Sequence, residues 1–246
     1  MPDFLQPDWP APARVKSRQT RRSGGVSVAP WASFNLGDHV GDNPLHVSAN
    51  RDALTACLPS APCWLQQVHS TLAVNAENTP KPAVADAAFT RQAGRVCAVM
   101  TADCLPVLFC DQAGSVVAAA HAGWRGLLGG VLESTLAAMA VAPEHVLAWL
   151  GPAIGPSAFE VGDEVRAAFV AELPAAGEAF APCGQGKWLA DLYALARLRL
   201  ARAGVTAVYG GNACTYSDPA RYFSYRRDGV TGRMATLIWL DGNDSV

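Results

Sequence analysis

The chain has 246 residues, half of them hydrophobic, and its formal charge at neutral pH is −2. This length and composition are typical of a soluble globular protein with a sizeable core. No long run of lysine or arginine is present, so we expect neither a nucleic acid nor an anionic membrane as a partner. No apolar run reaches membrane-spanning length, and residues 1–12 lack the pattern of a signal peptide.

The cysteine content indicates a reducing compartment. The seven cysteines are odd in number, and several lie inside apolar segments. This pattern does not suit the disulfide framework of a secreted protein. We therefore expect a cytoplasmic protein.

Hydrophobic periodicity and turn signals predict the following elements in chain order. Residues 1–12 are rich in proline and predict an extended lead-in, and the basic segment 16–27 predicts a turn. Apolar positions at helical spacing predict helices at 44–57, from about 126, at 162–173 and at 188–203. Apolar runs of strand length predict strands at 63–69, 95–102, 105–110, 115–121, 146–150, 205–209 and 235–240.

The order of these elements predicts an α+β (mixed α/β) fold. Some strands follow one another directly and others are separated by helices, which favours mixed sheets over a purely parallel, doubly wound sheet. No internal repeat or low-complexity stretch is present, and only 174–186 resembles a linker. We expect an extended lead-in over 1–20 and a single domain of mixed β-sheets flanked by helices over 21–246.

Three potential metal ligands, His69, Cys104 and His121, each stand at the end of an apolar run. Singly, such a residue is commonly part of the core. Together they form the ligand set of a catalytic zinc site, in which water takes the fourth position and its pKa falls to about 7. No C-x-x-C or H-x-x-x-H spacing indicates a structural zinc site. Small and polar neighbours strengthen the assignment: Gln66, Gln67, Asp103, Gly123 and Arg125.

Seven segments, in order, resemble the YfiH-like laccase-domain family. They are SFNLGDHVGD (33–42), LQQVHS (65–70), ADAAFT (85–90), TADCLPVLF (101–109), AHAGWRGLLGGV (120–131), LGPAIGPSAFEVGDEV (150–165) and FSYRRDGVTGRMA (223–235). The resemblance covers roughly residues 20–240. Ser70, where the family commonly has glycine, and Phe89, in place of a smaller aliphatic residue, depart from the pattern.

The resemblance implies a bacterial cytoplasmic enzyme with zinc on His69, Cys104 and His121. Its implied activities are phosphorolysis of adenosine, inosine, guanosine or methylthioadenosine, with deamination of adenosine at the same site. The implied fold is similar to that of the cytotoxic necrotizing factor catalytic domain, over a single catalytic domain at 21–246. We expect purine nucleosides and phosphate as small-molecule partners and a monomeric chain.

Two residues receive chemical roles in this hypothesis. In deamination, metal-activated water attacks C6 of the purine, and Asp103 relays the proton. In phosphorolysis, phosphate attacks C1′ of the ribose, and the guanidinium of Arg125 is the first candidate for a phosphate clamp. Structural alternatives stay open, because Asp103 also suits a turn cap and Arg125 a solvated helix end.

Four further residues are candidates for the substrate site. Arg51 and Arg226 are additional phosphate ligands, and Asn35 is a candidate contact to the sugar hydroxyls. Asp86 is assigned to the substrate site or to a place behind a ligand histidine that it orients. Among the aromatic residues, Trp124, Phe34 and Tyr225 are candidates for stacking on the purine.

Two other classes of enzyme are weighed against the purine hypothesis. A multicopper oxidase needs more histidines than the five present and an H-x-H pair. Copper can still bind a His2Cys site in vitro, and any oxidase activity is then incidental. In a Cys-His hydrolase or deamidase, Cys104 is a nucleophile activated by His121. His69 favours a metal instead, because a triad needs an Asn or Asp to orient its histidine. The family resemblance also suggests an amidase that edits a peptidoglycan precursor.

Overall fold

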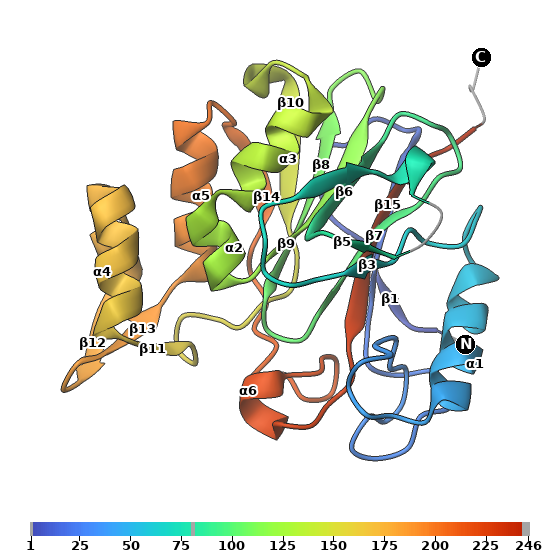
Figure 1. The fold of residues 1–246 in the computed structure, drawn as a ribbon, viewed down its shortest axis with the longest axis horizontal. Helices are drawn as coiled ribbons and strands as arrows, with labels where there is room; N and C mark the ends of the chain where they lie inside the picture. The colour runs from blue at the N-terminus through green and yellow to red at the C-terminus, as the bar shows by residue number, and fades with distance from the viewer. Residues whose placement is uncertain (1, 80–81, 243–246) are drawn as a thin grey trace.

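Two β-sheets packed face to face form the centre of the fold, with helices on both outer faces (Figure 1). The structure is a computed structural model and describes residues 2–79 and 82–242. Its layers run from helices through a six-stranded sheet and a four-stranded sheet to one further helix. The predicted fold class, mixed sheets flanked by helices, is confirmed.

The six-stranded sheet has the order β14-β10-β8-β9-β6-β4. The β10–β14 and β4–β6 pairs are parallel and the other pairs are antiparallel. Its strands are β4 (Ala73–Asn75), β6 (Ala87–Thr90), β8 (Leu105–Asp111), β9 (Val117–Ala122), β10 (Val146–Leu150) and β14 (Ala207–Gly210).

The four-stranded sheet has the order β1-β2-β15-β7 and is antiparallel throughout. Its strands are β1 (Phe4–Leu5), β2 (Val15–Thr20), β7 (Cys97–Thr101) and β15 (Met234–Leu240). The turn predicted from residue 16 is wrong, because β2 occupies the start of that segment. Its buried positions Val15, Ser17 and Gln19 alternate with less buried Lys16 and Arg18, which is the pattern of a strand.

Alternation along the central strands produces three apolar layers. On β8, Phe109 faces the helices, whereas Leu108 faces the second sheet. On β7, Val99 lies between the sheets and Ala98 packs towards the outer helix. Helices α2 (Trp124–Gly129), α3 (Val131–Met139) and α5 (Leu192–Arg202) cover the six-stranded sheet, and α1 (Pro44–Thr55) covers the four-stranded one.

Smaller elements surround this centre. A three-stranded sheet, β11 (Glu160–Gly162), β12 (Phe180–Gly184) and β13 (Lys187–Ala190), stands with α4 (Asp163–Glu172) at one side of Figure 1. The remaining elements are β3 (Leu65–Gln66), β5 (Ala83–Val84), α6 (Tyr225–Asp228) and 3-10 turns at Ala76–Asn78, Pro143–His145 and Pro174–Ala179. Within the described ranges, no helix has the length and hydropathy needed to cross a membrane.

Most predicted elements are confirmed, and three need correction besides the turn described above. The single helix predicted from about 126 is two helices, α2 and α3, which are separated at Gly130 with a φ of +101°. The helix predicted at 188–203 begins only at Leu192, because Asp191 accepts a hydrogen bond from Ala194 N as its N-cap and the preceding residues pair in a hairpin. Of the strand predicted at 63–69, only Leu65–Gln66 forms a strand. The confirmed elements are α1, α4, β7, β8, β9, β10, β14 and β15.

Candidate metal centre and its cleft

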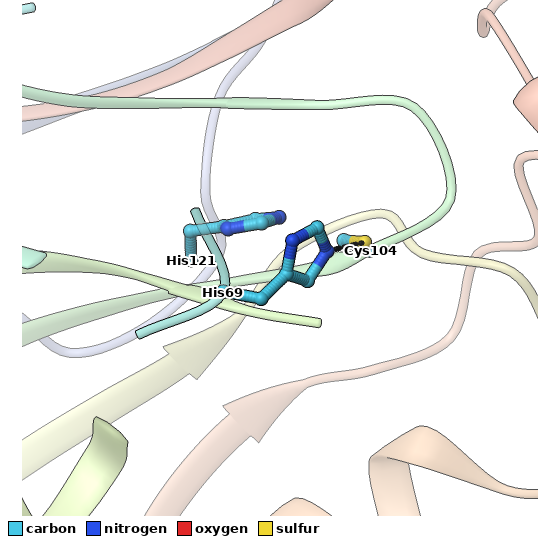
Figure 2. Close-up of side chains that lie close together, drawn as sticks. All are labelled: His69, Cys104 and His121. Atoms are coloured by element: carbon cyan, nitrogen blue, oxygen red, sulfur yellow. Dashed lines mark hydrogen bonds between the residues drawn. The ribbon is translucent and has the colours of Figure 1, made fainter. Parts of the chain in front are cut away.

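The structure brings together His69, Cys104 and His121 from three separate segments (Figure 2). His69 follows β3, Cys104 lies in the turn between β7 and β8, and His121 lies near the end of β9. One ligand atom from each residue lies within 4.8 Å of the others. The Cys104 Sγ atom is 3.6 Å from His69 Nε2, and the two imidazole centroids are 4.8 Å apart.

Asp86, which precedes β6 and is completely buried, holds two of these segments together. Its Oδ1 is 2.8 Å from His121 Nδ1 and accepts the backbone N–H of His69 at 3.0 Å. Its Oδ2 accepts hydrogen bonds from Val68 N, Ser70 N and Ser70 Oγ. The backbone of Asp86 also accepts His121 N at 2.7 Å. A proton on His121 Nδ1 leaves Nε2 free to bind a metal.

The charges of the site depend on this network. Burial raises the pKa of Asp86, but hydrogen bonds from His121 and Ser70 outweigh it and lower the pKa to about 2. Burial also raises the pKa of Cys104, yet the adjacent His121 and His69 lower it overall. Burial lowers the pKa of His121, whereas Cys104 and Asp86 raise it overall. The protein thus favours a thiolate at Cys104, which is the form that binds metal.

The donor set fits a metal of intermediate softness. One thiolate and two imidazoles, with ligand atoms within 4.8 Å of one another, match the donor set of a three-ligand zinc site with an open position. His121 also has a buried carboxylate behind it, as metal-binding histidines usually do. His39 lies at the cleft, but it is exposed, contacts Asp38 and is not part of the group.

Asp103 precedes Cys104 and anchors the turn that carries it. Its φ is +90°, and its carboxylate accepts Thr215 Oγ1 and Arg226 N, each at 2.6 Å. Its carbonyl accepts Ile154 N at 2.9 Å. The side chain predicted to relay protons therefore also links the Cys104 turn to α6.

The three candidate ligands line a cleft of about 780 Å³. Three predicted phosphate ligands, Arg51, Arg125 and Arg226, line it too. Arg51 donates to Leu36 O and pairs with Asp38, and Arg226 donates to Glu160 O. Arg125 lies over the Trp124 ring at 4.3 Å and has no hydrogen bond or ion pair among the described residues. Arg125 is exposed, and all of its guanidinium donors are available to an anion.

The predicted sugar contact Asn35 needs correction. It is completely buried, and its amide bonds to the backbone of Gly37 and Arg233 and to the Asp42 carboxylate. It lies outside the cleft lining and stabilises the loop beside it. Asp86 is likewise buried behind the ligands, so the second of its two predicted places, orienting a histidine, is the one that the geometry supports.

Sequence reasoning assigned no role to several residues of the cleft. These are Asp38, Trp64, Met100, Phe159 and Arg233. Of these, Asp38, Phe159 and Arg233 stand inside the segments that resemble the family, and their position there was the available signal. Trp64 and Met100 carry no comparable signal. The stacking candidate Phe34 is completely buried and lies outside the cleft, whereas Trp124 and Tyr225 line it.

Residues 16–241 match the family described as multi-copper polyphenol oxidoreductase laccase, and the chain belongs to this family. The chain is 56% identical over 238 residues to purine nucleoside phosphorylase PA4543 of Pseudomonas aeruginosa, covering 96% of this chain and 98% of that protein. It is 55% identical over 243 residues to purine nucleoside phosphorylase YfiH of Escherichia coli, covering 98% and 100%.

Solved structures agree with this assignment. The crystal structure of Neisseria meningitidis protein NMB0706 matches with a TM-score of 0.95 and 57% identity, covering 97% of this chain and 99% of that chain. YlmD from Geobacillus stearothermophilus matches with a TM-score of 0.88 and 32% identity, covering 97% and 96%. The resemblance found in the sequence motifs is confirmed.

Gly123, which follows β9, yields a prediction about the metal centre. A Cβ there would lie 2.5 Å from His69 Cδ2 and 3.0 Å from Cys104 Sγ. Overpacking typically costs about 1–3 kcal/mol, so we expect Gly123→Ala to weaken metal binding by about fivefold or more. Titration of metal-free protein against a chromophoric chelator measures this. Gly184→Ala is the control, because its Cβ would meet only Lys187 Cβ at 3.9 Å. Equal affinity in both variants would contradict the packing argument.

Proposed function

We propose that the protein is a zinc-dependent purine nucleoside phosphorylase. Its substrates are adenosine, inosine, guanosine or methylthioadenosine, which it splits into the base and a ribose 1-phosphate product, and it also deaminates adenosine at the same site. The single observation that carries the proposal is the convergence of His69, Cys104 and His121 in a cleft that also presents Arg125. Relatives named purine nucleoside phosphorylase support the substrate class.

The metal is held by His69, Cys104 and His121 in this proposal, with His121 binding through Nε2. Bound zinc would supply a Lewis acid at the open position, where it can polarise a water or a purine substituent. Copper can occupy the same donors in vitro, because divalent copper generally binds such ligands more tightly than zinc. We therefore regard oxidase activity as incidental.

The phosphate is bound by Arg125 in this proposal. A guanidinium presents two parallel N–H donors to two phosphate oxygens, and the Trp124 ring supports its plane. Arg51 and Arg226 already donate to backbone carbonyls, so they have fewer donors to offer. When phosphate and nucleoside bind in the same cleft, the bimolecular reaction becomes a reaction between two oriented groups, which lowers its barrier.

Asp103 handles the proton in this proposal. Its two oxygens accept Thr215 Oγ1 and Arg226 N, which fixes the plane of the carboxylate. A carboxylate has about four acceptor positions, so each oxygen keeps one for a substrate proton. Asp103 lines the cleft next to Cys104, which supports its role as the acid-base group for a purine nitrogen or a leaving amine.

A second candidate, a Cys-His hydrolase or deamidase, is favoured by one specific contact. His121 lies between Cys104 and Asp86, in the order of a nucleophile, a base and an orienting carboxylate. Asp86, which the sequence analysis named as a candidate to orient a ligand histidine, also supplies the orienting carboxylate that such a triad needs. An amidase acting on a peptidoglycan precursor would use the same pair. His69 favours the metal, because it adds a third donor that such a triad does not use.

The central experiment incubates protein of known zinc content with adenosine or inosine, with and without phosphate, and separates the products. We expect free base and ribose 1-phosphate only with phosphate, and inosine from adenosine without it. The variant Cys104→Ala should lose bound zinc and both activities together. Cys183→Ala, an exposed cysteine outside the cleft, is the matched control. Full zinc occupancy without any product would overturn the purine proposal and favour amide hydrolysis.

The phosphate clamp is tested separately with Arg125→Met. A hydrogen bond to a charged group contributes about 1.5–3 kcal/mol, so kcat/KM for phosphate should fall by about tenfold to a hundredfold. Adenosine deamination, which uses no phosphate, should change far less. Steady-state kinetics at varied phosphate measures both, with the remote variant Arg202→Met as control. If phosphate saturation is unaltered in Arg125→Met, another group binds the anion.

A further inference from the structure

The segment that carries His69 runs beside an edge of the four-stranded sheet. Strand β7 is the last strand in the order of that sheet. Cys63 begins to pair with this edge, since it forms a parallel bridge with Cys97 and donates its N–H to Val96 O at 2.8 Å. The chain then turns away, and β3 pairs with β5 instead. The backbone after Cys63 therefore does not pair with the rest of this edge of β7.

The side chain of Gln67 makes hydrogen bonds to β7 that the backbone of its own segment does not make. Its Nε2 donates to Met100 O at 2.8 Å, and its Oε1 accepts Met100 N at 2.8 Å. A primary amide thus satisfies both backbone groups of one strand residue, as the peptide group of a neighbouring strand does. Both contacts have the geometry of full-strength hydrogen bonds.

These two hydrogen bonds join segments that carry different metal ligands. Gln67 lies two residues before His69, and Met100 lies four residues before Cys104. Asp86 joins His69 to His121 but makes no hydrogen bond to the Cys104 turn among the described residues. The carboxylate network therefore reaches Cys104 only indirectly, through His121 and the pairing of β9 with β8.

We propose that Gln67 is a positioning residue that sets the separation of His69 from Cys104 at the metal centre. The proposal rests on the metal site of the proposed function. With Gln67 in place, the His69 segment is held on one side by Asp86 and on the other by β7. His69 itself has a φ of +61°, which a non-glycine residue adopts only when its surroundings hold it.

The variant Gln67→Met tests the proposal, because methionine has a similar length and cannot make the two hydrogen bonds. Removing a group that orients metal ligands typically costs about tenfold to a hundredfold in affinity. We expect at least a tenfold weaker affinity for Co²⁺, and altered d–d bands in the absorption spectrum of the Co²⁺ protein. These bands report ligand geometry, which a loss of stability alone does not move.

Two further variants keep the test decisive. Gln67→Glu retains an acceptor for Met100 N but sets a carboxylate oxygen against Met100 O, which repels it, so its affinity should also fall below that of the parent. Gln66→Met is the matched control, because Gln66 is exposed and its side chain makes no hydrogen bond among the described residues. Its affinity and spectrum should equal those of the parent.

An unchanged Co²⁺ affinity and spectrum in Gln67→Met would overturn the proposal. So would a rise in nucleoside KM alone, which would make Gln67 a substrate contact. If the parent itself binds no metal, the metal proposal fails. Crystal structures of the parent and Gln67→Met then test the positioning role of Gln67 separately. A Cys104 Sγ to His69 Nε2 distance retained near 3.6 Å in the variant would overturn it, and a longer one would support it.

Discussion

The buried carboxylate of Asp86 is the constraint on which the rest of the site depends. It has no exposed surface, and it receives hydrogen bonds from three backbone N–H groups, one hydroxyl and one imidazole. A buried charge is tolerated only when such partners surround it. Removing any of them leaves the buried anion one partner short, so these hydrogen bonds hold the loop before His69 and the end of β9 together. The low pKa of Asp86 records the same balance.

The layered fold makes this arrangement possible. Strands β6 and β9 pair directly, which places Asp86 beside His121, while the turn between β7 and β8 brings Cys104 from the second sheet to the same end. His69 and Asp103, next to or within the ligand set, both have positive φ values. Such conformations cost about 1–3 kcal/mol each and persist where surrounding contacts enforce them. Here the enforcing contacts are the hydrogen bond from His69 N to Asp86 and the hydrogen bonds that the Asp103 carboxylate accepts from Thr215 and α6.

The sequence pointed to the three candidate ligands and the central strands because both have a local pattern. His69, Cys104 and His121 each stand at the end of an apolar run, and β10 is a short buried run with clear ends. Roles that depend on tertiary contacts were harder to predict. Asn35 carries an amide of the kind that binds sugar hydroxyls, yet this amide makes its hydrogen bonds within the protein. Trp188 continues an apolar helical pattern, yet it pairs with Pro182 in a hairpin. Asp86 was a candidate to orient a ligand histidine, but the sequence did not tell which histidine, because Asp86 lies 35 residues from His121 in the chain.

The variant Asp86→Asn tests the central claim most directly. Asparagine keeps the size of the side chain, but its amide nitrogen cannot accept the hydrogen bonds that one carboxylate oxygen receives. The account predicts metal affinity at least about tenfold below that of the parent, together with displacement of His69 in a crystal structure. Asp52→Asn, an exposed position in α1, should match the parent. Parental metal affinity and an unmoved His69 in Asp86→Asn would show that the candidate ligands are positioned without the carboxylate, and would contradict the account.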